Sequence, residues 1–182
     1  MEWVVFVGSP RANGDSSRIA SILTQKISDV DPSVNFHLYS VADLDIKGCI
    51  GCDYCQCGSC VYNDEMKEIL ETLLMADGVL VISPVYFSGV PSQFKAVLDR
   101  FQPLFWKRQA LLQAGRELPH KKPLYLYVVG GGGDPHGFDG LVTTVRSAFA
   151  LADFALCDTV SYIGQRKHLV PSSIVLPEVF RD

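Results

Sequence analysis

The sequence lacks several features that would have indicated a class of function directly. Its most apolar stretch, residues 78–87, is interrupted by Pro84 and is far shorter than the ~20 residues of a membrane helix. Basic residues are not in excess, because sixteen Lys and Arg against twenty Asp and Glu give a net charge of −4. The chain therefore lacks the positive field that nucleic-acid binding requires. We expect neither a membrane nor a nucleic acid as a partner.

Two common nucleotide-binding patterns are also missing. The sequence has no Gly-x-Gly-x-x-Gly dinucleotide pattern and no loop that ends in Gly-Lys-Ser/Thr. What is present is a chain of 182 residues with 48% apolar and 20% charged residues, which indicates one packed domain over residues 1–182. The first seven residues are acidic and apolar and lead directly into a glycine turn, unlike a signal peptide. We therefore expect a cytoplasmic protein.

Strand-like and helix-like segments alternate along the chain. Strands apolar on both faces are predicted at 3–7, 78–83 and 124–129, and alternating strands at 34–40 and 154–163. Helical spacing separates them, so the fold class is α/β with a doubly wound, five-stranded parallel sheet. The two alternating strands have one solvent-exposed face each and therefore belong at the edges of the sheet, which favours the flavodoxin-like order 2-1-3-4-5. The tail after Gly164 is polar and has no clear period, and the histidines His37 and His168 are interpreted as surface residues.

Ligands of such sheets bind beyond the carboxyl ends of the strands, where strands one and three diverge. The loop at 9–17 offers three serine hydroxyls, Asn13 and the guanidinium of Arg11 at a helix N-terminus, which suits a phosphomonoester. The loop at 84–89 presents two aromatic rings, and 130–133 is a run of four glycines that allows close backbone approach. Each loop also has a purely structural alternative. The loop at 9–17 could be a capped turn, the aromatic rings at 84–89 could pack under a helix or at a subunit interface, and 130–133 could be a flexible turn.

Two of these loops, taken together, resemble a known family. The resemblance covers about residues 3–133 and rests on Gly8-Ser9-Pro10-Arg11 with Asn13-Gly14-x-Ser16, and on Ser83-Pro84-Val85-Tyr86-Phe87 followed by Gln93-Phe94-Lys95-Ala96-Val97-Leu98-Asp99-Arg100. These motifs resemble those of the NADPH-dependent FMN reductase-like flavoproteins. The resemblance implies that the FMN phosphate is held by Ser9, Arg11, Asn13, Ser16 and Ser17. It also implies that the isoalloxazine ring is bordered by Pro84, Val85, Tyr86, Phe87, Ser88, Gly130, Gly131 and Gly132.

Five of the six cysteines lie in a cysteine-rich loop at about 47–63. In a reducing compartment, such a group more often binds metal or is redox-active than forms structural disulfides. The spacing of Cys49, Cys52, Cys55 and Cys60 resembles the compact motif of the iron–sulfur flavoproteins within this family, which implies a 4Fe–4S cluster. The open alternatives are zinc held by two cysteine pairs, a dithiol or disulfide site, or no metal at all.

Two further cysteines fall outside that motif. Cys57 departs from the spacing and is either a spare thiol or a ligand in place of Cys55 or Cys60. Cys157 falls on a predicted strand, where we expect a small buried side chain.

The resemblance predicts an FMN-dependent oxidoreductase that accepts electrons from NAD(P)H or a ferredoxin-type donor and passes them to an acceptor. Because the cofactor carries the chemistry, no catalytic side chain is assigned. Two alternatives stay open: a quinone or nitroaromatic reductase with no cluster, and an electron carrier without a substrate site. The resemblance, together with apolar residues expected to be exposed around 101–106, indicates a homodimer or homotetramer.

Overall fold

The computed structural model describes residues 1–165 and 169–181, and its core is a five-stranded sheet with every neighbouring pair parallel. The spatial order is β2-β1-β3-β4-β5, which confirms the flavodoxin-like order. The strand bounds are β1 Glu2–Val7, β2 Asn35–Ser40, β3 Gly78–Pro84, β4 Lys122–Gly130 and β5 Phe154–Ile163. The three inner strands are almost wholly buried, and the two edge strands are partly wet, as the apolar patterns predicted.

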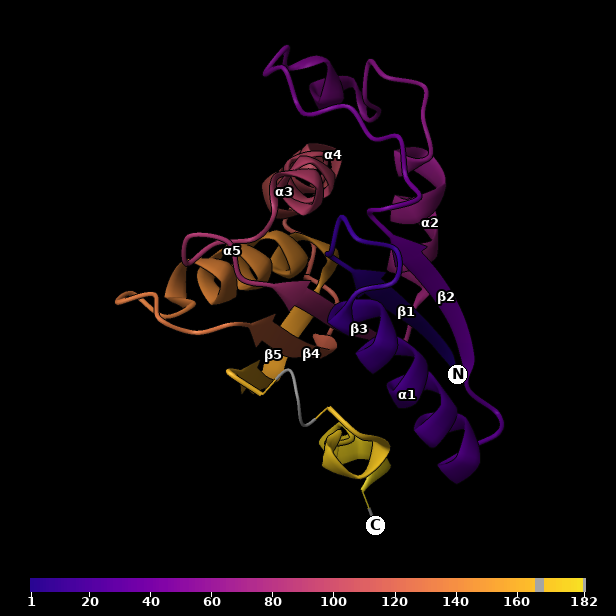
Figure 1. Cartoon of the computed structure of the whole chain (residues 1–182). Helices are drawn as coiled ribbons and strands as arrows, with labels where there is room; N and C mark the ends of the chain where they lie inside the picture. The colour runs from indigo at the N-terminus through magenta and orange to yellow at the C-terminus, as the bar shows by residue number, and fades with distance from the viewer. Residues whose placement is uncertain (166–168, 182) are drawn as a thin grey trace.

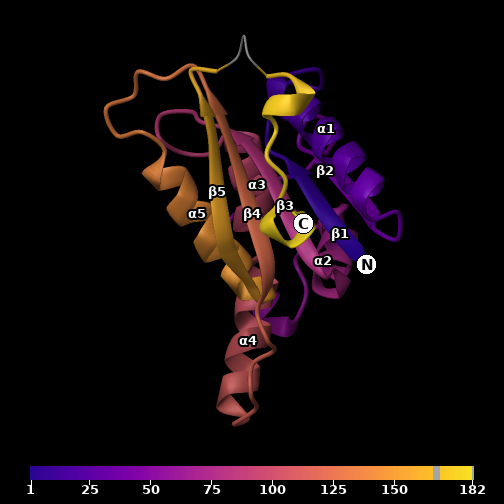
Figure 2. The same ribbon diagram turned by 90° about the horizontal axis from the view of Figure 1, so that it is seen from below.

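The α-helices cover both faces of the sheet (Figures 1 and 2). They are α1 Asp15–Val30, α2 Met66–Met75, α3 Ser92–Asp99, α4 Gln102–Gln113 and α5 Asp139–Phe149. Alternate residues of β1 divide the core: Trp3, Val5 and Val7 pack on the α1 side, whereas Val4 and Phe6 pack with α2, α3 and α5. This division follows from the two-residue repeat of a strand.

The expected break at Pro103 is a boundary between two helices. Pro103 lies in the first turn of α4, where its missing N–H costs no helical hydrogen bond. Figure 2 shows that α4 extends well beyond the end of the sheet. The expectation of exposed apolar residues at 101–106 is wrong for Phe101 and Leu104, which are buried against the sheet. Phe105 and Trp106 are only half-buried.

The C-terminal segment covers the sheet on the same side as α1. Two short 3-10 turns, η4 Pro171–Ser173 and η5 Glu178–Phe180, bring Leu169, Ile174 and Phe180 into the core. The Phe180 ring lies 4.9 Å from the Trp3 ring, centroid to centroid. A segment with no period in the sequence therefore completes one layer, while the predicted surface position of His168 lies outside the described residues.

The prediction that Cys157 is buried is wrong, because its side chain is exposed. The pairing of β4 with β5 skips this residue: Leu124 pairs with Leu156, and Tyr125 pairs with Asp158. Such an irregularity leaves one residue of the edge strand unpaired and breaks the inside–outside alternation. Across the described residues, no helix combines the length and the apolar character needed to cross a membrane.

Candidate functional site

The loop after β1 leads into an uncapped helix. Gly14 occupies the N-cap position of α1 in an extended conformation and supplies no side-chain cap. The turn before it is held by Ser9, whose Oγ accepts a hydrogen bond from the Arg11 N–H at 3.2 Å. Ser9 and Ser16 are 5% and 2% exposed, whereas Arg11 is exposed. The loop and the first turn of α1 thus combine N–H groups, the buried hydroxyls of Ser9 and Ser16 and the exposed cation of Arg11, a combination that suits an anion.

The loop after β3 contains a tight two-residue turn. The Tyr86 N–H donates to the Gly89 carbonyl at 2.9 Å, and the Gly89 N–H donates to the Tyr86 carbonyl at 3.0 Å. The central residues, Phe87 and Ser88, both have left-handed backbones, with φ of 50° and 61°. Glycine and asparagine are the usual residues at such positions, so this turn is strained. The Phe87 side chain is fully exposed, so the strained turn holds an aromatic ring in solvent.

That turn is fastened to α5. The Leu141 N–H donates to the Ser88 carbonyl at 2.8 Å, and a Cβ on Gly140 would lie 3.0 Å from the same oxygen. The Ser88 hydroxyl donates to the His136 carbonyl at 3.3 Å. Ser88 is therefore engaged in anchoring the turn, and its neighbour Phe87 is fixed in an outward position.

The loop after β4 contributes an open glycine run. Gly132 and Gly133 have φ of 84° and 93°, a conformation that side chains rarely adopt. A Cβ on Gly131 would meet no atom within 4 Å. The backbone here is accessible from the side on which the other two loops lie.

These three loops gather around two adjoining hollows. A hollow of about 510 Å³ is lined by Ser9, Arg11, Asn13, Gly14, Asp15, Ser16, Pro84, Val85, Tyr86, Val129, Gly130 and Gly131. A second hollow, of about 310 Å³, continues from it past Val85, Gly130 and Gly131 to Phe87 and Gly132. One end is thus polar and the other is apolar and glycine-lined, which fits a ligand with a phosphate and a flat ring system.

Two of the predicted site residues line neither hollow, and several residues that do line the hollows were not predicted. In the smaller hollow, these are Asp134, Gly137, Phe138 and Ile163. Ser17 and Ser88 line neither hollow. Gly14, Asp15 and Val129 do line the larger one. Each of the three borders a predicted residue in the sequence, so a wider window around the motifs would have found them.

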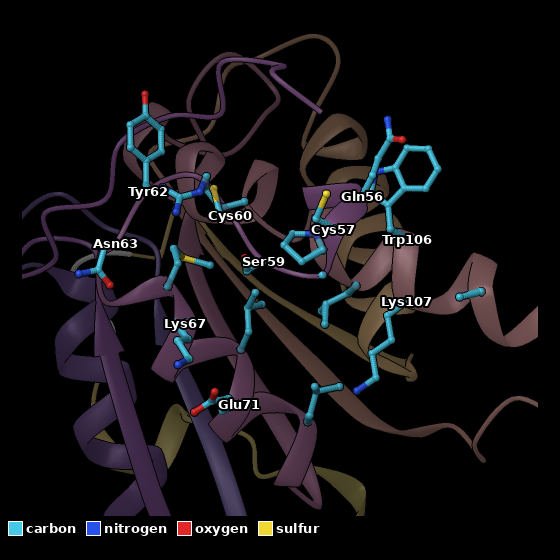
Figure 3. A pocket seen from close by; sticks show the side chains of 18 residues that line it. Gln56, Cys57, Ser59, Cys60, Tyr62, Asn63, Lys67, Glu71, Trp106 and Lys107 are labelled. Carbon is cyan, nitrogen blue, oxygen red and sulfur yellow. The ribbon is translucent and has the colours of Figure 1, made fainter. Parts of the chain in front are cut away.

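The four motif cysteines share a hollow of their own. Cys49, Cys52, Cys55 and Cys60 all line a space of about 250 Å³, which Cys57 does not line. Cys57 instead borders the larger neighbouring pocket of about 700 Å³ between the cysteine loop, α2 and α4, where Figure 3 shows it near Gln56 and Trp106. This separation agrees with the motif spacing and with an interpretation of Cys57 as a spare thiol.

The sulfur atoms do not yet converge on one point. Among the described residues, no group of three or more His, Cys, Asp or Glu side chains is close enough to hold a metal ion. Burial raises the pKa of the Cys55 thiol, and the nearby Cys49 and Cys60 raise that pKa further. A bound metal would reverse this effect, because its positive charge favours thiolates. Four soft donors on one small hollow fit a metal–thiolate centre.

A buried arginine fastens the cysteine loop to α3. Arg100, 2% exposed at the end of α3, donates two hydrogen bonds to the Asp64 carboxylate, at 2.7 and 2.9 Å. It also donates to the Lys47 carbonyl at 2.9 Å, and its guanidinium lies 4.9 Å from the centre of the Tyr62 ring. Burial by itself would lower the pKa of Arg100, but Asp64 and then Cys60 outweigh it and raise that pKa.

In the sequence, Arg100 is the last residue of the second family motif, and no role is predicted for it there. Its signal was a charged residue directly after the apolar stripe of a predicted helix, which usually indicates a solvated helix end. The contacts with residues 47 and 64 could not be inferred, because they depend on how the loop folds back.

Comparison with known proteins places these features in context. A family model described as NADPH-dependent FMN reductase matches residues 1–166. An iron–sulfur flavoprotein of Methanocaldococcus jannaschii is 36% identical over 105 residues, which are 57% of this chain and 53% of the relative. An iron–sulfur flavoprotein of Clostridioides difficile is 35% identical over 98 residues, covering 53% of this chain and 44% of the relative. The chain thus spans about half the length of the curated relatives that it matches.

A solved structure supports the fold independently. The apo form of an NADH:FMN oxidoreductase superposes with a TM-score of 0.61 at 18% sequence identity, covering 98% of this chain and 81% of the other. At such low identity, the similarity concerns the fold alone.

Proposed function

Because the chain belongs to the NADPH-dependent FMN reductase family, we propose that it is an FMN-dependent oxidoreductase formed by one domain over residues 1–182. The observation that carries this proposal is the convergence of the loops after β1, β3 and β4 on two adjoining hollows. Those loops come from distant parts of the chain, and they bring an anion-binding end and a flat apolar end together. FMN when bound supplies hydride and single-electron chemistry.

Each loop has a separate task in this proposal. Ser9, Ser16 and the first N–H groups of α1 bind the phosphate, and Arg11 closes over it from the solvent side. Tyr86 and Phe87 border the ring, and the glycine run lets the backbone approach it closely. The chain thus binds and orients the cofactor and needs no acid or base of its own.

We further propose that Cys49, Cys52, Cys55 and Cys60 hold a 4Fe–4S cluster. Their common hollow and the names of the curated relatives support this assignment. The cysteine hollow and the two FMN hollows have no lining residue in common. Electron transfer between the two centres therefore suits a homodimer or homotetramer in which the cysteine loop reaches the flavin of a neighbouring subunit.

The proposed donor is NAD(P)H or a ferredoxin-type protein, in the reducing environment of the cytoplasm. A reduced compartment suits a chain in which all six cysteines are free thiols. The family of the chain supports NADPH, whereas cysteines that bind a cluster would suit a one-electron partner.

A second candidate is a quinone or nitroaromatic reductase without a cluster. The observation in its favour is that the thiols do not converge in the described part of the chain. A pure electron carrier would differ from both, because it would exchange electrons only with protein partners.

Anaerobic purification followed by flavin, iron and sulfide assays separates these functions. The proposal predicts FMN together with iron and sulfide, and reduction by NADPH or by reduced ferredoxin. Flavin without iron would favour the cluster-free reductase, whereas reduction by ferredoxin or dithionite but not by NADPH would favour the carrier. Absence of flavin, with no uptake of added FMN, would refute the proposal.

A further inference from the structure

The guanidinium of Arg100 links the two ends of the cysteine loop. It binds the Lys47 carbonyl before the first cysteine and the Asp64 carboxylate after the last one. The ring of Tyr62, which lies in the same loop, packs against the face of the guanidinium. Residues that are distant along the loop therefore meet at one buried cation.

The position of Arg100 relative to the cysteines is equally specific. Arg100 lines the hollow of the four motif cysteines and also the larger pocket beside it, and Cys60 lines both as well. Figure 3 shows Cys60 near Tyr62, across the pocket from Cys57 and Trp106. Among the described residues that line the cysteine hollow, Arg100 is the one basic residue.

One donor of this arginine has no partner. The Nε–H of Arg100 is buried and forms no hydrogen bond, although the two terminal nitrogens of the same side chain are well satisfied. A buried donor without a partner is costly, and a redox or ligand-binding role is one of the explanations for retaining it. The Cys60 sulfur is a candidate acceptor, because Cys60 and Arg100 line the same two hollows.

We propose that Arg100 is a positioning residue that closes the cysteine loop and raises the reduction potential of the centre held by its thiolates. This inference rests on the proposed 4Fe–4S cluster. Gaining one electron makes a thiolate-bound centre more negative by one charge. A fixed, desolvated cation with a free N–H donor stabilises the reduced form more than the oxidised one. Asp64 opposes this effect in part, because its carboxylate is hydrogen-bonded to the same guanidinium.

The test compares substitutions of opposite electrostatic sign. Arg100→Gln removes the cation, and Asp64→Asn removes the opposing carboxylate while leaving the cation. The potential is measured by anaerobic titration with dithionite, followed by the electron paramagnetic resonance of the reduced cluster. Arg100→Gln is expected to disfavour the reduced form roughly tenfold, which lowers the potential by about 59 mV. Asp64→Asn is expected to shift it in the opposite direction.

Two controls separate electrostatics from loss of loop structure. Arg100→Lys keeps the charge and is expected to restore most of the potential, and it also serves if Arg100→Gln fails to fold. Arg108→Gln removes another partly buried arginine, whose ion pair with Asp153 at 2.6 Å lies away from the cysteine hollow, and should leave the potential unchanged. The potential of bound FMN should not move in any variant, because Arg100 does not line the FMN hollows.

The outcomes distinguish this inference from the proposed function. Wild-type protein without iron after anaerobic purification would overturn the cluster and, with it, the role of Arg100. Wild-type protein that holds the cluster, combined with an unchanged potential in Arg100→Gln, would overturn the role of Arg100 alone. Shifts in the same direction for Arg100→Gln and Asp64→Asn would also overturn it, because a general loosening of the loop would explain both.

Discussion

Arg11 provides the most informative perturbation of the proposed FMN site. Its side chain is exposed and lines the larger hollow together with the buried Ser16. Arg11→Ala removes a cation without disturbing a packed side chain, and Ser16→Ala removes a hydroxyl that is 2% exposed. Both substitutions should weaken binding of the phosphate and leave the fold intact.

The expected magnitude differs between the two residues. A hydrogen bond to a charged group contributes about 1.5–3 kcal/mol. For the solvent-exposed Arg11 we expect the lower end of that range, roughly a tenfold loss of FMN affinity. For the buried Ser16 we expect about 2 kcal/mol, roughly a 30-fold loss. The double variant should lose on the order of 100-fold, because two groups that contact one phosphate are not fully additive.

The assay is quenching of flavin fluorescence on titration with apoprotein, performed with both FMN and riboflavin. Riboflavin lacks the phosphate, so Arg11→Ala should leave its affinity unchanged while weakening that of FMN. Arg116→Ala is the matched control, because Arg116 is exposed and follows α4, away from both FMN hollows. Equal weakening of riboflavin and FMN, or no weakening of either, would refute the phosphate assignment.

Four further substitutions test the cysteine loop, its ion pair and the C-terminal segment. In an iron assay, Cys52→Ser should contain no iron but still bind FMN, whereas Cys57→Ser should retain iron. Loss of iron in Cys57→Ser but not in Cys52→Ser would instead identify Cys57 as the ligand and Cys52 as the spare thiol. Burial alone would raise the pKa of Asp64, but the hydrogen bonds and charge of Arg100 outweigh it and hold that pKa below its usual value of 3.8. Asp64 therefore stabilises the fold above about pH 4, and this contribution disappears as the pH falls through the lowered pKa. Thermal unfolding of Asp64→Asn should consequently lose less stability between pH 5 and pH 3 than the wild type does, and equal losses would contradict the pair's role. Phe180→Ala should lower the free energy of unfolding by about 3–5 kcal/mol in urea denaturation, and a change under 1 kcal/mol would mean that the segment contributes little to the core.

The fold could be predicted because the apolar pattern of each strand indicates how many of its faces are buried. Strands β1, β3 and β4 are apolar on both faces, and β2 and β5 alternate, which fixes the centre and the edges of the sheet. The general rule for doubly wound sheets then indicates which loops meet. The common lining of the larger hollow by Arg11, Tyr86 and Gly131 agrees with that rule.

Features that depend on long-range packing could not be predicted in the same way. The C-terminal segment has no period because its buried residues come from short turns and not from a regular element. The exposure of Cys157 follows from an irregularity in strand pairing that no local pattern reveals. Arg100 is buried because Asp64 and the Lys47 carbonyl reach it from a loop far away in sequence.

The strained turn at Phe87 is intermediate between these cases. The sequence indicated an aromatic pair after a central strand, but it gave no reason to expect a left-handed backbone at Phe87 and Ser88. Strain of this kind persists where the surrounding structure imposes it, here through the hydrogen bond from Leu141 to the Ser88 carbonyl.

The central claim is that the loops after β1, β3 and β4 form one binding site for FMN. The most direct test is to strip the purified chain of bound flavin and titrate it anaerobically with FMN while recording the visible spectrum. We expect equimolar uptake of FMN and a flavin band shifted from that of free FMN. At the same FMN concentration, the Arg11→Ala, Ser16→Ala double variant should bind less FMN, so its spectrum should be closer to that of free FMN. A chain that folds but leaves the spectrum of added FMN unchanged would contradict the central claim.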